Sequence, residues 1–160
     1  MTREPEPEAV AIRRARASDL ASIVGLYAED AIGATRERPG SPLPEAYARA
    51  FAEIDRDPSH ALVVAELAGE VVGTLQLTLL PNLTFEGGKR ALVEAVHVAA
   101  RHRGRRIGEE LMRWAIERAR AAGCRLVQLT TDARRTDAKR FYERLGFVPS
   151  HVGMKLHLDR

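Results

Sequence analysis

Residues 93–108 read VEAVHVAARHRGRRIG and join an apolar run, a basic loop and the start of a long helical pattern. The run Val93–Val98 predicts a strand buried on both faces, because polar residues hardly alternate with apolar ones. The loop that follows carries four arginines and one histidine within residues 101–106. Apolar residues at helical spacing then predict a helix from about Arg106 to Ala122. We expect the rest of the chain to fold around this strand, turn and helix.

Two glycines, Gly104 and Gly108, bracket the entry into this helix. A helix N-terminus presents backbone N–H groups without an intrahelical acceptor, together with the positive end of the helix dipole. Such a turn suits a phosphate or a pyrophosphate, and the side chains of Arg103, Arg105 and Arg106 add positive charge. The spacing is neither that of a P-loop nor that of a dinucleotide-binding loop. The turn therefore predicts a phosphate site outside those two classes.

Composition limits the class of protein. A chain of 160 residues, 45% hydrophobic and 29% charged, is sufficient for one globular domain. The net charge is +3 and the sequence pI is 9.4, and much of the arginine excess is local, which favours an anionic ligand such as a polyphosphate cofactor or a nucleic acid. The single cysteine, Cys124, excludes a disulfide within a monomer, so we expect a cytoplasmic protein. No apolar run approaches the roughly 18 residues of a transmembrane helix, so no membrane partner is expected.

The acidic, proline-rich residues 1–9 predict a disordered tail, followed by one domain over residues 10–160. Strands are expected at 10–13, 61–67, 71–80, 93–98, 126–131, 147–148 and 152–158, and helices at 20–30, 45–55, 106–122 and 138–145. This order predicts a mixed α/β sheet in a single domain. The loops 33–44 and 81–89 are the candidates for substrate contact.

A second motif lies at Ala138–Phe147, which reads AKRFYERLGF. It resembles the motif A-x-x-F-Y-x-x-x-G-F of the GNAT superfamily of acetyl-CoA-dependent N-acyltransferases. The turn Arg103–Gly108 resembles the motif [Q/R]-x-x-G-x-[G/A] of the same superfamily. Two positions depart from the family pattern: Arg106 takes the place of the middle glycine, and Arg135 stands where many members have asparagine. Together the two motifs make the resemblance specific, and it extends over nearly the whole chain.

The resemblance implies a GNAT-like fold, with a mixed, mainly antiparallel central sheet flanked by helices. It implies an N-acetyltransferase that moves an acetyl group from acetyl-CoA to a primary amine, with small molecules as the expected substrates, by direct attack in a ternary complex. It also places cofactor-binding residues on the strand and on the turn. The strand would hold the pantetheine arm and the thioester through backbone groups, and the turn would hold the phosphates; these positions are Val96, His97, Val98, Arg103, Gly104, Arg105, Arg106, Ile107 and Gly108.

Two side chains are candidates for catalysis. The resemblance implies that Tyr142 lies near the cofactor sulfur and protonates the leaving thiolate; the competing interpretation is a core aromatic beside Phe141. Glu94 interrupts an apolar strand, and the resemblance implies that it is the base that deprotonates the amine, directly or through water. An ion pair between Glu94 and Arg90 is the structural alternative. His97 is an alternative base, or else a structural histidine.

Two other functions stay open at this stage. The arginine-rich turn is compatible with a nucleic-acid-binding module, but aromatic residues make up only 5% of the chain and no RNA-recognition or zinc motif is present, so no nucleic acid is expected. A regulator that binds acetyl-CoA without catalysis is the other alternative, which the departures at Arg106 and Arg135 keep open. The histidines lack metal-ligand spacing, so no metal is expected. Dimers are frequent in the superfamily, which makes a homodimer a candidate assembly.

Overall fold

A computed structural model describes residues 9–158, so the predicted tail at 1–9 lies almost wholly outside the described residues. The chain divides into two compact units, the first ending at Gln128 and the second beginning at Leu129. Each unit is described in turn.

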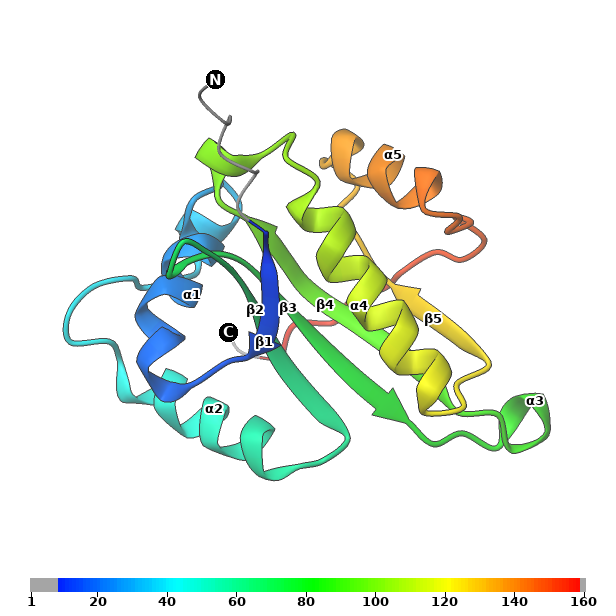
Figure 1. The fold of residues 1–160 in the computed structure, drawn as a ribbon. Coiled ribbons are helices and arrows are strands. Elements are labelled where there is room, and N and C mark those ends of the chain that lie inside the picture. The colour runs from blue at the N-terminus through cyan, green and yellow to red at the C-terminus, as the bar shows by residue number, and fades with distance from the viewer. Residues whose placement is uncertain (1–8, 159–160) are drawn as a thin grey trace, which may run out of the picture. The chain divides into compact units, whose positions relative to one another are not determined.

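A five-stranded sheet with the order β1-β2-β3-β4-β5 is the centre of the fold within residues 9–158 (Figure 1). The first three pairings are antiparallel, whereas β4 connects to β5 through a helix, the crossover that parallel neighbours require. The α/β class and the mainly antiparallel sheet are therefore confirmed. The strands are β1 (Ala11–Arg14), β2 (His60–Leu67), β3 (Glu70–Leu80), β4 (Arg90–Val98) and β5 (Leu126–Leu129).

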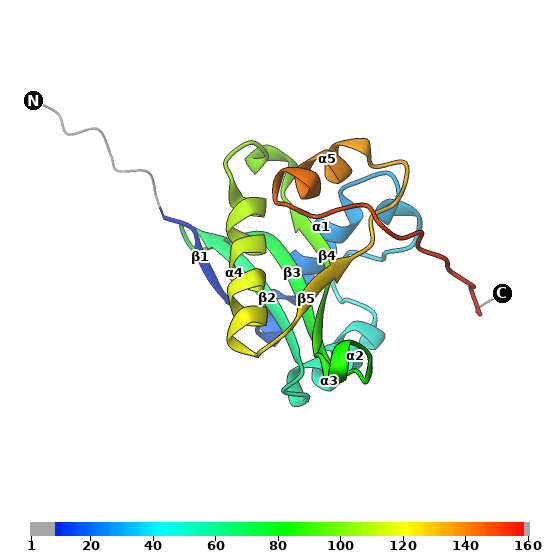
Figure 2. The same cartoon turned by 90° about the vertical axis from the view of Figure 1, so that its right-hand side faces the viewer.

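Helices cover both faces of this sheet. Helix α4 (Ile107–Ala121) packs on β3 and β4, while α1 (Leu20–Ala28) and α2 (Glu45–Arg56) lie against the opposite face (Figure 2). The expected helices at 20–30, 45–55 and 106–122 are thus present, with shifts at their ends. The shorter turns are η1 (Ala17–Asp19), η2 (Gly33–Thr35), α3 (Thr84–Gly87) and η3 (Ala100–His102).

The buried face of α4 is the one that the helical spacing predicts. Its buried residues are Ile107, Leu111, Met112, Ala115 and Ala119. Gly73 on β3 lets the first turns of α4 approach the sheet, because a Cβ at this position would lie 3.1 Å from Leu111 Cδ1 and 3.3 Å from Ile107 Cγ2. This close approach fixes the N-terminus of α4 beside the end of β4.

An ion-pair cluster links β1 to the start of α1. Arg13 donates to Asp19 at 2.8 and 3.0 Å and to Glu66 at 2.7 Å, and the backbone N–H of Arg16 donates to Asp19 at 2.7 Å. The guanidinium and the backbone N–H lower the pKa of Asp19 against the effect of burial. The buried carboxylate of Asp19 is thereby satisfied by hydrogen bonds from residues close to it in the chain.

The second unit contains α5 (Thr136–Arg144), and Gly146, two residues after its end, adopts the left-handed conformation with φ 94°. The expected strands at 147–148 and 152–158 are wrong, because no strand is assigned to the described residues after Gly146. The expected strand at 126–131 likewise ends early, at Leu129. An alternating pattern specifies which face of a strand is apolar, but the strand itself forms only when a neighbour supplies the hydrogen bonds.

Candidate active site

A β-bulge interrupts the predicted active-site strand at Ala95. Thr74 on β3 pairs with His97, and Gln76 pairs with Glu94, so two residues of β4 stand against the single residue between Thr74 and Gln76. Ala95 takes a left-handed conformation, φ 50°. A bulge of this kind bends the strand and leaves a residue unpaired in the ladder. The regular ladder between β3 and β4 is therefore interrupted at this position.

The bulge also changes which side chains share a face. In a regular strand Glu94 and His97 would point to opposite faces. Their partners Gln76 and Thr74 are two residues apart on β3, so the bulge places Glu94 and His97 on one face, roughly 7 Å apart along the strand. Tyr27 of α1 contacts His97 on this face. The two candidate bases thus lie on the face that α1 covers.

The expected burial of Glu94 is wrong. Glu94 is exposed, as is Ala95 beside it, because the bulge turns this part of β4 out of the sheet. The alternative ion pair with Arg90 is not formed either: Arg90 donates to Gln128 at 3.3 Å and to Thr84 at 2.9 Å. A carboxylate that water solvates needs no ion-pair partner, so burial in the strand is no longer a reason to assign Glu94 the role of the base. What supports a role is its position on the strand.

His97 packs against the ring of Tyr27, with the ring centroids 5.1 Å apart. Burial raises the pKa of Tyr27 to about 12. The charge of Glu37 adds to this shift, whereas a hydrogen bond with Thr74 opposes it. Glu37 comes from the loop 33–44, where it accepts hydrogen bonds from Tyr47 at 2.9 Å and from Arg36 at 3.0 Å. The loop expected to contact substrate therefore places a carboxylate near this face of β4. The residue pattern of the loop contains no signal that would have identified Glu37.

The basic turn adopts left-handed backbone at two positions, Gly104 with φ 79° and Arg106 with φ 64°. Arg106 is thus in a conformation that glycine adopts without strain, which explains why a glycine at this place suits the turn. The Arg106 side chain points into solvent, 82% exposed, and forms an ion pair with Glu109 at 3.5 Å. The departure at Arg106 therefore leaves the backbone path of the turn intact.

Several backbone N–H groups of this turn have no acceptor within the described chain. The first helical hydrogen bond of α4 runs from the Glu110 N–H to the Arg106 carbonyl at 3.0 Å, and no side chain caps the helix. The N–H groups from Gly104 to Glu109 are left without a protein acceptor in residues 9–158. Donors in this number at the start of a 15-residue helix fit a diphosphate.

The four arginines of the turn have different neighbours. Arg101 forms an ion pair with Glu70, and Arg105 donates to His102 Nδ1 at 3.0 Å. Arg106 pairs with Glu109, as described above. No hydrogen bond or ion pair occupies the Arg103 guanidinium within residues 9–158. Arg103 is therefore the arginine best placed to contribute its full charge to an anionic ligand.

Tyr142 lies on α5 in the second unit, between two other aromatic rings. Its ring centroid is 5.2 Å from that of Phe141 and 6.0 Å from that of Phe147. Burial raises the pKa of the phenol, although the charge of Arg135 opposes this shift. The half-buried side chain thus packs against two neighbouring rings and also keeps its proton at neutral pH, which a general acid requires.

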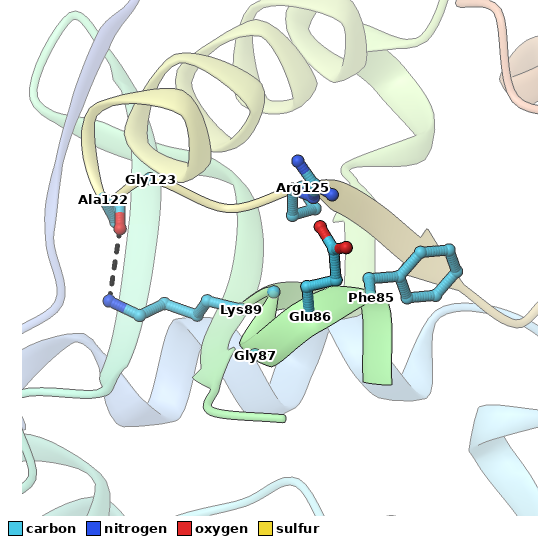
Figure 3. A pocket seen from close by; sticks show the side chains of 8 residues that line it. Phe85, Glu86, Gly87, Lys89, Ala122, Gly123 and Arg125 are labelled. Carbon is cyan, nitrogen blue, oxygen red and sulfur yellow. Dashed lines mark hydrogen bonds between the residues drawn. The ribbon is translucent and has the colours of Figure 1, made fainter. Parts of the chain in front are cut away.

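A hollow of about 300 Å³ lies elsewhere on the first unit, between α3 and the end of α4 (Figure 3). Lys89 donates there to the Ala122 carbonyl at 3.2 Å, and the side chains of Glu86 and Arg125 point toward one another. Because β4 runs from Arg90 to Val98, eight residue steps of about 3.3 Å each, the loop 81–89 lies roughly 25 Å from the end of β4. This loop and its hollow are therefore separate from the basic turn.

The described residues contain no cluster of three or more His, Cys, Asp or Glu side chains arranged to hold a metal ion. Among the same residues, no helix has the length and apolar character needed to cross a membrane. Burial raises the pKa of the Cys124 thiol, which disfavours the thiolate form that a nucleophile needs.

Comparison with known proteins gives the family. The model of the acetyltransferase (GNAT) family matches residues 21–147, which include both the basic turn and α5. The chain belongs to the GNAT family. It is accordingly an N-acetyltransferase that uses acetyl-CoA as its cosubstrate, and the unpaired N–H groups of the turn suit the diphosphate of that cosubstrate.

Relatives match this chain over most of its length. The GNAT chain is 38% identical over 107 residues to an aminoalkylphosphonate N-acetyltransferase from Salmonella typhimurium, which covers 67% of this chain and 69% of that protein. A crystal structure from Bacillus halodurans, described as a transcriptional regulator, is 49% identical with a TM-score of 0.92, covering 94% of this chain and all of that one. A putative acetyltransferase from Agrobacterium tumefaciens is 31% identical with a TM-score of 0.80, covering 92% and 99% of the two chains.

Proposed function

We propose that this GNAT protein acetylates the primary amine of a small molecule by direct attack in a ternary complex. The amine nitrogen attacks the thioester carbonyl carbon, the C–S bond breaks, and the thiolate of CoA leaves. The observation that carries the proposal is the bulged end of β4 beside a helix start with unpaired N–H groups. One part can orient a thioester, and the other can hold the phosphates of the same cosubstrate.

The cosubstrate would be held by the basic turn and by the backbone of β4. Backbone N–H groups from Gly104 to Gly108 would bind the diphosphate, with Arg103 and Arg105 adding charge. The backbone at Val96–Val98, next to the bulge, would bind the pantetheine arm and the thioester. An N–H directed at the thioester oxygen stabilises the charge that develops there during attack.

Proton transfers would involve two side chains. Tyr142 would give its phenol proton to the departing thiolate, and its raised pKa is compatible with this step. Glu94 would accept the proton of the amine through water, since its exposed carboxylate is in contact with solvent. His97 shares the face of β4 with Glu94 and is the alternative acceptor.

The acceptor would be a cation before it reacts. Glu37 and Glu94 place negative charge on the side of the sheet that α1 covers, and this charge would attract an ammonium group. We assign substrate selection to the loop 33–44, which carries Glu37, because the loop 81–89 is roughly 25 Å from the end of β4. Glu37→Gln is expected to raise KM for the amine while CoA affinity stays unchanged.

A screen of acetyl-CoA consumption against amines tests this function. The panel would hold aminoalkylphosphonates, suggested by the Salmonella relative, with aminoglycosides, polyamines, free amino acids and a peptide N-terminus. We expect turnover with a small amine and intersecting double-reciprocal lines, whereas parallel lines would refute direct attack. The description of the Bacillus structure as a regulator favours a second candidate, a sensor of acetyl-CoA without catalysis. CoA binding without turnover on any amine, peptides included, would support that candidate.

A further inference from the structure

The carboxylate of Glu29, at the end of α1, accepts a hydrogen bond from the segment that leads into the basic turn. The backbone N–H of Ala100 donates to Glu29 Oε2 at 2.9 Å, although the two residues are 71 positions apart in the chain. Ala100 begins η3, which connects β4 to the basic turn. The contact therefore joins α1 to the backbone that precedes the free N–H groups at 104–109.

The preferences of α1 do not explain a carboxylate at this position. The C-terminus of a helix carries the negative end of the helix dipole, where a cation is stabilising and an anion is not. Glu29 is the C-cap of α1, and no basic residue lies in the last turn of this described helix. An acidic side chain that is unfavourable for its own helix points to a role outside that helix.

The segment that Glu29 contacts has few other connections to the fold. Ala99 is buried, and its N–H donates to a carbonyl of β3 at 2.8 Å. Beyond Ala100, no backbone hydrogen bond joins residues 101–105 to another element within residues 9–158. The hydrogen bond to Glu29 therefore fixes the backbone at the point where the turn leaves the sheet.

The end of α1 is itself held firmly. The Tyr27 ring packs against His97, with the ring centroids 5.1 Å apart. Gly33 lies so close to this end that a Cβ there would collide with the carbonyl oxygen of Tyr27. The N–H of Gly33 also donates to the carboxylate of Asp30 at 2.7 Å. Glu29 thus extends from a well-packed part of the fold toward a turn with free donors.

We infer that Glu29 is a positioning residue for the cosubstrate, acting through the backbone of Ala100 and not by contact with CoA. It holds the start of the turn so that the N–H groups that follow converge on the diphosphate. The inference rests on the cosubstrate site proposed above. A turn that is correctly placed for only part of the time binds with an affinity reduced by that fraction. One hydrogen bond changes such an equilibrium by about 2- to 10-fold, which is the change expected in CoA affinity.

The charge of Glu29 has the opposite effect on an anionic ligand. A carboxylate near the basic turn weakens the attraction for phosphates, so removal of its charge alone should tighten CoA binding. Glu29→Gln removes the charge but keeps an oxygen that can accept from the Ala100 N–H. Glu29→Ala removes both the charge and the acceptor. The difference between these two variants therefore isolates the hydrogen bond.

Calorimetry of CoA binding to the full chain tests the inference. Glu29→Gln should bind CoA at least as tightly as wild type, and Glu29→Ala should bind it about 2- to 10-fold more weakly than Glu29→Gln. Neither variant should lose thermal stability, because both remove an anion from a helix C-terminus. Glu70→Gln is the matched control: Glu70 pairs with Arg101 of the same segment through side chains alone, so its loss should not weaken CoA binding.

Equal CoA affinities of Glu29→Gln and Glu29→Ala would overturn the inference and leave the cosubstrate site intact. A parallel loss of affinity and thermal stability in Glu29→Ala would also overturn it, because the side chain would then act on the whole fold. The Ala100 amide should exchange with solvent faster in Glu29→Ala than in Glu29→Gln, and equal rates would show that the hydrogen bond has no effect. If CoA shifts no N–H resonance from Gly104 to Gly108 in wild type, the site itself is refuted and the inference with it.

Discussion

Replacement of Arg106 by glycine separates the effect of its left-handed backbone on stability from the contribution of its side chain. Arg106 has φ 64° and ψ 10°, and a residue with a Cβ loses about 1–2 kcal/mol in this left-handed region. Glycine removes that strain, but it costs about 0.5–1 kcal/mol through the entropy of the unfolded chain. Loss of the exposed ion pair with Glu109, at 3.5 Å, costs about 0.5 kcal/mol or less.

Arg106→Ala is the matched variant, because alanine loses the same ion pair and keeps the strain. The difference in unfolding free energy should therefore favour Arg106→Gly over Arg106→Ala by about 0.5–1 kcal/mol. Urea denaturation measures this difference directly. Both variants keep the backbone N–H at position 106, so calorimetry should give CoA affinities within about threefold of wild type.

Arg103→Ala is the positive control for that calorimetry. A hydrogen bond to a charged group contributes about 1.5–3 kcal/mol, so this variant should lose roughly 10- to 100-fold in CoA affinity. Equal stability of the glycine and alanine variants would show that position 106 is not left-handed. A tenfold loss of CoA affinity in both would show that the Arg106 side chain itself contacts the cosubstrate.

Four other perturbations have expected outcomes. Tyr142→Phe should lower kcat by roughly 10- to 1000-fold with little change in CoA affinity; an unchanged kcat, with chemistry rate-limiting, would assign the tyrosine to packing alone. Gly108→Val should weaken CoA binding strongly in calorimetry, because a branched side chain would crowd the phosphate path, and equal affinity would contradict this. Glu94→Gln should remove the lower-pH limb of kcat/KM and leave the limb due to the amine, whereas a full wild-type profile would exclude Glu94 as the base. The pKa of Tyr27 is raised to about 12, so the stability that its neutral phenol contributes is complete below pH 10 and is lost as the pH rises to 12. Tyr27→Phe should therefore reduce the alkaline loss of unfolding free energy by about 2–3 kcal/mol. An unchanged loss in the mutant would refute this.

Patterns that depend on local spacing could be predicted from the sequence. The buried face of α4 follows from apolar residues at helical spacing, and the hairpin β2–β3 follows from two apolar runs separated by a turn around Gly69. The basic turn could be predicted as a phosphate site because glycines and arginines lie between the end of a strand and the start of a helix. In each case the signal lies within one element or between neighbours along the chain.

Features set by pairing between strands could not be predicted in the same way. The bulge at Ala95 depends on the register of β4 against β3, and it exposes Glu94 in a strand that reads as buried. Glu37 reaches the site through contacts with Tyr47 and Arg36 that no spacing reveals. The segment 152–158 has the pattern of a strand but finds no partner in the described chain, which a single sequence cannot show.

Amide chemical shifts during a CoA titration test the proposed cosubstrate site most directly. The N–H resonances of Gly104, Arg106 and Gly108 should move the most, because those groups lack protein acceptors and would donate to the diphosphate. The N–H of Gly87, in the hollow at the opposite end of β4, should stay in place. Shifts at Gly87 without shifts from Gly104 to Gly108 would contradict the assignment of the basic turn to acetyl-CoA.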